Sequence, residues 1–353
     1  MKNKIWGFLI LLAVVVSAVA YSFYNKNTKS DVEINGLLGG EKIGLYESEE
    51  FKKDIKKTYK LRMDYRKSGS FDMLNTDFSN YDYLFPSSQL VLEMFEDEGY
   101  KSLGSDIIFN SPIVLYTRSG VLEGLIKNNL VNKKADIYYL DMAKLADMMV
   151  EEKTWADLGV ENIYGSILVS TTDPLKSNSG NMFLGLLANA LNDNRVVAES
   201  DLGEISPKIR KIYKKLGYMQ TSSADIFNQF LRQGSGSYPL VAGYESQLLE
   251  FSKTDPELFD QVKDDIHILY PSPTVWSSHI YIALSEDGKR GLEALKDPEI
   301  QKLAWRNHGF RTIVAGTAKV EDFDVKSLAK DIDRVIPMPK VDVMKELMQA
   351  SKP

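Results

Sequence analysis

Cysteine is absent from this sequence of 353 residues, and histidine is scarce, with only His267, His279 and His308. The lack of cysteine excludes disulfides, thiolate metal sites, a cysteine nucleophile and a lipidated N-terminal cysteine. The histidines are not spaced with one another or with carboxylates as metal ligands are, so we expect no metal and no cofactor. Neither a Gly-x-Ser-x-Gly nor a His-Glu-x-x-His motif is present, which argues against a secreted hydrolase. We therefore expect no catalytic residues.

The sequence also lacks a long stripe of basic residues. The formal net charge is −6, and the densest basic cluster, residues 52–57, follows Glu49 and Glu50 on a predicted helix, where close charge pairs are typical of a solvated face. This pattern argues against nucleic acid as a partner. An apolar content of 44% with 26% charged residues is typical of a globular chain, and the length allows two domains.

The N-terminus has the composition of an export segment. Lys2 and Lys4 precede residues 5–20, which carry no charge, and extending this run to residue 24 gives a helix of about 30 Å, enough to cross a bilayer. Residues 18–20, Ala-Val-Ala, also fit a signal-peptidase cleavage site. A signal peptide and an uncleaved signal anchor both remain open for residues 1–24; we favour the anchor. Either segment places the body outside the cytoplasm.

The body of the chain, after a polar linker at residues 25–33, alternates between the two periodicities of secondary structure. Strands are predicted at residues 41–46, 60–65, 81–85, 107–117, 164–170, 238–242, 266–270 and 276–284. Helices are predicted at residues 48–59, 89–96, 182–191, 221–231, 288–295, 298–307 and 341–350. Strands that alternate with helices are typical of an α/β fold with a largely parallel sheet. The long strand at 107–117 could cross between two domains.

Two strand-to-helix turns are rich in small hydroxyl residues. Residues 170–181 place Ser177 and Ser179 at the start of an apolar helix, and Ser87 and Ser88 follow an earlier strand in the same way. The free amide groups and the dipole of such a helix start can hold an anion or a carboxylate. A serine there can instead only cap the helix. The pattern leaves both interpretations open, but turns of this kind converge at the carboxyl ends of the strands in an open α/β sheet.

Three segments carry a resemblance to a known family. Residues 172–181, 241–247 and 297–311 resemble bacterial extracellular solute-binding proteins of the type II periplasmic-binding fold, near the molybdate, sulfate and phosphate binders. The similarity extends from about residue 41 to residue 311, and the order of the segments is more specific than any one of them. The resemblance implies an α/β fold of two lobes, joined by two crossover strands, with the ligand in the cleft.

The same resemblance implies domain boundaries and ligand contacts. Lobe one would comprise residues 34–116 plus 278–353, and lobe two residues 117–277. The implied contacts are Ser48, Ser87 and Ser88 in lobe one, and Thr172, Ser177, Ser179, Gly180, Asn181, Tyr244 and Glu245 in lobe two. Glu245 departs from an oxyanion site, because its carboxylate would repel an anion. It would recognise a cationic or hydroxylated group, or serve as a structural acceptor.

The function expected from these observations is that of an extracytoplasmic solute-binding protein. It would act as a monomer, close its lobes on a small polar ligand, with anions among the candidates, and serve a permease of an ABC-type uptake system. The alternative is a membrane-tethered sensory or assembly module of the same fold that binds a protein partner.

Overall fold

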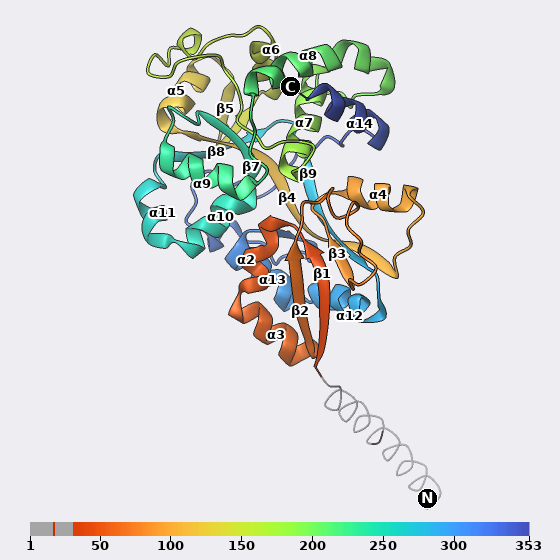
Figure 1. Cartoon of the computed structure of the whole chain (residues 1–353). Coiled ribbons are helices and arrows are strands. Elements are labelled where there is room, and N and C mark those ends of the chain that lie inside the picture. Colours follow the sequence, from red (N-terminus) through yellow and green to blue (C-terminus); the bar gives the residue numbers. More distant parts are fainter. Residues whose placement is uncertain (1–16, 18–30, 353) are drawn as a thin grey trace, which may run out of the picture.

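The computed structural model describes Ser17 and residues 31–352 (Figure 1). Apart from Ser17, the predicted signal anchor or signal peptide at residues 1–24 lies outside the described residues, as does the linker up to residue 30. Among the helices formed by the described residues, none combines the length and the apolar character needed to cross a membrane.

The strands of the first lobe form a mixed sheet. Their order is β2 (Leu61–Lys67), β1 (Val32–Leu38), β3 (Tyr83–Phe85), β9 (Trp276–Ala283), β4 (Gly104–Arg118) and β10 (Arg311–Thr312). β1 runs parallel to both β2 and β3, whereas β9 runs antiparallel to β3 and β4. The carboxyl ends of β1, β2 and β3 therefore point to the same edge of the sheet, and that edge faces the second lobe (Figure 1).

The second lobe shares one strand with the first. Its sheet contains β4 together with β7 (Leu240–Tyr244), β8 (Ile266–Pro271), β6 (Ile137–Leu140) and β5 (Val131–Lys134). Residues 104–112 of β4 pair with β9, and residues 113–118 pair with β7 and β8, so β4 runs through both sheets. β8 is followed by β9 after only four residues, which gives the second crossing. The predicted interlobe strand at residues 107–117 is thus confirmed, and the fold is the expected two-lobed α/β type.

Helices cover the faces of both sheets. The first lobe carries α2 (Ile43–Glu47), α3 (Glu49–Tyr59), α4 (Gln89–Asp97), α12 (Glu286–Leu295) and α13 (Pro298–His308), with the 3-10 turns η1 (Gly40–Lys42) and η4 (Val320–Asp322). The second carries α5 (Ser119–Lys127), α6 (Met142–Val150), α7 (Asn178–Leu191), α8 (Leu202–Leu216), α9 (Ser223–Gln233), α10 (Glu245–Thr254) and α11 (Pro256–Val262), with η2 (Ala156–Leu158) and η3 (Glu199–Asp201). α7 is buried along its whole length, which explains its nearly continuous apolar sequence.

Each lobe has its own hydrophobic core. In the first lobe, Ile34, Phe85 and Phe109 pack within one buried cluster, and in the second Leu115 and Leu187 belong to another. Burying each such side chain stabilises the fold by about 1.5–3 kcal/mol. The cluster of the second lobe also includes Leu90 and Val91 of α4, so apolar side chains of the two lobes meet there.

The structure corrects three predicted elements. Residues 41–46 form η1 and α2 instead of a strand, because an alternating run of six residues is too short to distinguish the helical period from the extended one. β1 begins at Val32, inside the predicted linker, where its polar neighbours hide the alternation. The predicted strand at 164–170 forms only isolated bridges, such as the one between Ser170 and Val241.

The C-terminal helix α14 (Val341–Ala350) lies on the second lobe. It packs against α7 and α8 (Figure 1), and a side chain at Gly185 of α7 would collide with Met338 just before α14. The end of the segment that the sequence assigns to lobe one therefore lies against lobe two. We propose that the lobe boundary in β4 follows the change of pairing near residue 112, four residues before the predicted boundary.

Candidate functional site

A small cavity lies between the lobes, where the carboxyl ends of several strands meet the starts of helices. Its volume is about 100 Å³. It is lined by Gly39–Glu41 after β1, residues 67–70 at the end of β2, residues 176–178 at the start of α7, residues 221–224 at the start of α9, and Tyr244 at the end of β7. This is the place in an open α/β sheet where ligands bind.

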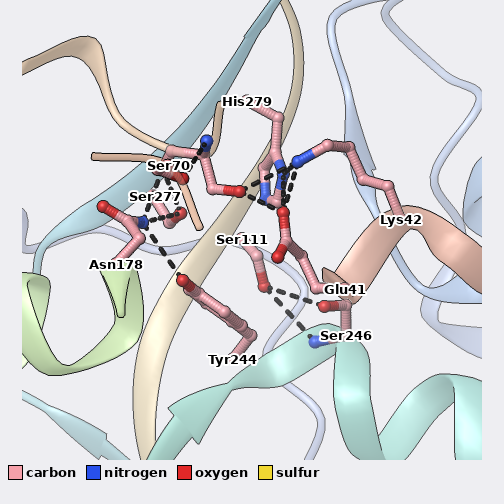
Figure 2. Close-up of polar contacts among 10 residues, drawn as sticks. Glu41, Lys42, Ser70, Ser111, Asn178, Tyr244, Ser246, Ser277 and His279 are labelled. Carbon is pink, nitrogen blue, oxygen red and sulfur yellow. Dashed lines mark hydrogen bonds and ion pairs between the residues drawn. The ribbon is translucent and has the colours of Figure 1, made fainter. Parts of the chain in front are cut away.

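A buried polar cluster forms the floor beside this cavity (Figure 2). Lys42 Nζ donates to Ser87 Oγ at 2.9 Å and lies 3.2 Å from His279 Nδ1. One carboxylate oxygen of Glu41, Oε1, contacts both Lys42 Nζ and Ser87 Oγ and lies 3.5 Å from His279 Nδ1. The side chains of Lys42 and His279 are 0% exposed and that of Glu41 is 11% exposed. The cluster thus joins a buried ion pair to a hydroxyl and an imidazole.

The charges in this cluster follow from burial and mutual contact. Burial raises the pKa of Glu41, but the Lys42 ammonium and the His279 ring outweigh it and hold that pKa well below its usual range. Burial lowers the pKa of Lys42 although Glu41 opposes the change. Burial, with the nearby Lys42 charge, lowers the pKa of His279 to about 4. At neutral pH the cluster therefore holds an ionised glutamate and a neutral histidine.

Hydrogen bonds join the lobes next to the cluster. Asn178 Nδ2, at the first turn of α7, donates to the backbone carbonyl of Ser87 at 2.7 Å and to Tyr244 Oη at 3.1 Å. Ser277 Oγ donates to the same Ser87 carbonyl at 2.7 Å, and the Ser87 amide donates to Ser70 Oγ at 3.1 Å (Figure 2). Ser87 is therefore the point at which side chains of both lobes meet, and the lobes are in contact there.

The second-lobe residues predicted from the sequence gather at the start of α7, but they mainly bind one another. Thr172 Oγ1 and Ser179 Oγ lie 2.8 Å apart, and Ser177 Oγ lies 3.1 Å from Ser179 Oγ. A side chain at Gly180 would collide with the carbonyl of Thr172. Asn181 Nδ2 donates weakly to the carbonyl of Pro174 at 3.4 Å. Of the predicted set in this lobe, Ser177 and Tyr244 line the cavity.

The remaining predicted residues have other contacts. Ser48 accepts from the amide of Phe51 and caps α3, and Ser88 accepts from the amide of Leu90 and caps α4. Glu245 is fully buried and receives two hydrogen bonds from Arg311, at 2.7 and 2.9 Å, and one from Tyr270 Oη at 2.5 Å. Of the two roles left open for Glu245, this geometry favours the structural acceptor.

The predicted contacts did not include several residues of the buried cluster, namely Glu41, Lys42, Asn178 and His279, with Ser70 and Ser277 beside them. Recognising β1 would have revealed the first two, because the polar turn Gly-Gly-Glu-Lys follows it directly, as Ser87 follows β3. Asn178 lies inside the segment that the sequence singled out. His279 was set aside because no metal-ligand partner lies near it in sequence, and the described residues contain no group of three metal-ligating side chains.

The comparisons with known proteins bear on this arrangement. No protein-family model and no curated protein sequence matches the chain. Among solved structures, the apo ferric ion-binding protein A of Pasteurella haemolytica superposes with a TM-score of 0.57 at 12% identity, over 90% of this chain and 95% of that one.

Two further structures are similar over comparable lengths. The sulfate-binding protein SubI of Mycobacterium tuberculosis H37Rv has a TM-score of 0.54 at 14% identity, over 89% of this chain and 96% of that one. The Trichodesmium protein IdiA (FutA), in complex with iron and citrate, has a TM-score of 0.52 at 12% identity, over 91% and 97%. Together with the shared strand β4 and the interlobe cavity, these matches show that the chain has the fold of the type II periplasmic solute-binding proteins.

Proposed function

We propose that this protein is a solute-binding protein, without enzymatic activity, that closes its two lobes on a small polar ligand. The observation that carries the proposal is the cavity between the lobes, lined by the turns that follow β1 and β2 and by the starts of α7 and α9. A ligand there touches both lobes at once, so it stabilises the closed arrangement by its differential affinity. The similar structures, which include ferric-ion and sulfate binders, support this function through the fold they share.

The size and lining of the cavity support a small solute. A volume of about 100 Å³ is well below the roughly 300–1,000 Å³ typical of sites for drug-sized ligands. The lining is rich in hydroxyl and backbone groups, including Ser68, Ser70, Ser177, Ser222 and Ser223. Such groups fix the orientation of a polar solute by hydrogen bonds.

The proposal extends to location and partner. The N-terminal segment with its basic residues and uncharged run supports an extracytoplasmic body, held at the membrane or released after cleavage. A tether would keep the binding protein near a permease of an ABC-type uptake system, which would recognise the closed form.

The experiment is a thermal-shift screen of the full-length protein against inorganic oxyanions, amino acids, amines and sugars. A ligand at 100 times its dissociation constant adds about 2.7 kcal/mol to the free energy of unfolding, so a hit raises the Tm clearly. Ala224→Trp, which places a bulky ring at the cavity from an exposed position, should abolish the shift, and the matched variant Ala198→Trp, at the exposed residue before η3, should keep it. No shift with any solute, from folded protein, would contradict the proposal.

A second candidate function is a membrane-tethered sensory or assembly module that binds a protein partner. The observation that favours it is the extent to which the cleft is filled by the chain itself: Asn178 and Ser277 bond to Ser87, and a side chain at Gly69 would press on the carbonyl of Lys176. A module that functions with its lobes already closed does not need a solute to close them. It predicts that small-angle scattering gives the same lobe spacing with and without every solute tested.

A further inference from the structure

A second cavity adjoins the first and shares its wall. Its volume is about 200 Å³, and the residues common to both linings are Gly40, Glu41, Ser223 and Ala224. It lies between the turn after β1 in the first lobe and helices α9 and α10 in the second. Glu41 therefore lies at the junction of two neighbouring cavities, and a solute longer than the first cavity would pass this carboxylate.

The second cavity has charges of one sign only. Glu41 and Glu250 line it, no lysine, arginine or histidine does, and the rings of Phe227 and Phe251 complete its apolar side. Glu250 Oε1 lies within hydrogen-bond distance of His308 Nδ1, at 2.7 Å, but the histidine itself is not part of the lining. Carboxylates beside aromatic faces attract a cation through both Coulomb and cation–π interactions, and they repel an anion.

The ion pair between Glu41 and Lys42 also presents its negative charge to the cavities. Glu41 lines both cavities, whereas Lys42 lines neither, so the negative end of the pair faces the space and the positive end faces the protein. Oε1 of Glu41 contacts Ser87 Oγ, and Figure 2 shows this oxygen turned towards Lys42 and His279 and the other oxygen turned away from them. That second oxygen, Oε2, accepts no hydrogen bond from the described residues.

A residue with an unpaired acceptor also lines the first cavity. Asn178, which is 5% exposed, lines it, and the Oδ1 atom of this residue is buried without a hydrogen-bond partner among the described residues. The lysines of this lining, Lys67 and Lys176, are exposed, so solvent and salt screen their charges.

We propose that the solute is a small organic cation that carries a protonated amine, and that the amine binds at Glu41 between the two cavities. Its N–H groups would donate to Glu41 Oε2, with Glu250 and the phenylalanine rings in the adjoining cavity. Charge-assisted hydrogen bonds of this kind are about twice as strong as neutral ones. The inference rests on the proposed solute-binding function and specifies the chemistry of its ligand.

The test is isothermal titration calorimetry of the full-length protein at low ionic strength. The cationic probes are 1,4-diaminobutane and lysine, the anionic probes are sulfate, molybdate and phosphate, and a neutral sugar panel completes the set. Glu41→Gln keeps the shape of the side chain and removes its charge. Glu250→Gln makes the same change at a side chain that is 26% exposed. It therefore tests the site even if Glu41→Gln does not fold. Glu299→Gln, on the exposed face of α13, is the matched control.

The expected result is that an amine binds to the wild-type protein. Its affinity should fall by about tenfold or more in Glu41→Gln and by a few-fold in Glu250→Gln, with no change in Glu299→Gln. Amine binding that is insensitive to both cavity variants would overturn the assignment. Binding of an oxyanion or a sugar in preference to every amine, with an oxyanion bound still more tightly by Glu41→Gln, would overturn the cation assignment and leave the solute-binding function standing. If no amine, oxyanion or sugar binds, the solute-binding function is overturned, and the cation assignment with it.

Discussion

Two glutamates near the contact between the lobes are buried beside a cation, and they differ in how completely their oxygens are used. Both oxygens of Glu245 are bound by Arg311, and Tyr270 adds a third hydrogen bond. Among the described residues, Lys42 and Ser87 bind one oxygen of Glu41 and none binds the other, and Glu41 lines both cavities. The first pair is a closed unit between β10 and α10, and the second is open on one side.

The difference shows that the burial of a charge does not by itself indicate a binding site. A carboxylate whose acceptor capacity is filled by the protein has nothing left for a ligand, whatever its position in the sequence. A carboxylate with a free oxygen beside a cavity retains part of its capacity. In the sequence, Glu245 stands out because a carboxylate does not fit an oxyanion site. In the structure, Glu41 is the carboxylate that has an oxygen available to a ligand.

The largest expected effect is on the closed pair. Arg311→Met leaves Glu245 buried without its cation and removes the hydrogen bonds from Arg311 to the carbonyls of Ala329 and Lys330, so the free energy of unfolding should fall by about 3–5 kcal/mol. Urea denaturation measures the loss. The double variant Arg311→Met with Glu245→Met should recover part of it, because no unpaired charge remains. A loss below about 1 kcal/mol would show that Glu245 is solvated and remove the contrast with Glu41.

The pH dependence of the free energy of unfolding should reveal the burial of His279 beside Glu41 and Lys42. His279 has a pKa of about 4 in the folded protein, below its ordinary value near 6.5, so between these values the unfolded chain binds a proton that the folded chain does not. Stability is therefore full above about pH 6.5 and falls by roughly 3 kcal/mol as the pH drops towards 4. The lowered pKa of Glu41 acts in the same direction at lower pH.

Urea denaturation across this pH range measures the slope. His279→Leu should make it shallower, because the variant has no imidazole to protonate at this position. Equal slopes for the wild-type protein and the variant would mean that His279 is solvated, and the cluster would then be more open than its geometry indicates.

The smallest of the three effects is expected when the open pair is broken. Lys42→Met also removes the cation beside a buried glutamate, but Glu41 can turn its charge towards the cavity and be hydrated there. The free energy of unfolding should fall by about 1–3 kcal/mol, less than for Arg311→Met in the same assay. Lys302→Met, which breaks an exposed pair on α13, should change it by less than about 1 kcal/mol. Equal losses at Lys42 and Arg311 would abolish the distinction between an open and a closed pair.

The fold was largely predictable because its longest elements have clear periodicity. The strand at residues 107–117 and the helices at 298–307 and 341–350 are found within a few residues of their predicted bounds. The misassigned run at residues 41–46 is short: Ile43 and Leu45 fit the period of a strand, whereas Ile43 and Tyr46 fit one face of a helix. β1 was not predicted, because Asp31 before it and Glu33 within it give this part of the chain the composition of a linker.

The site was less predictable because its contacts are made between distant parts of the chain. Lys42 lies 45 residues from Ser87 and 237 from His279 in sequence, and nothing local indicates that a lysine next to a glutamate is buried. Lysine is almost never buried unless it is paired. The predicted hydroxyl turn at 177–181 does lie at the contact between the lobes, but its serines satisfy one another, which only the three-dimensional arrangement reveals.

The path of the chain through both sheets also bears on how the protein is made. β3 pairs with β9 through Tyr83 and Ala283, so about two hundred residues must be synthesised after β3 before its partner strand exists. Two strands so far apart in sequence can pair only after a long loop has closed. The entropy lost in closing the loop is offset only once the pairing forms, and this slows folding. During synthesis, the sheet of the first lobe would therefore stay incomplete until the second lobe has been made. A chain with an incomplete sheet is still unfolded enough to be translocated across a membrane.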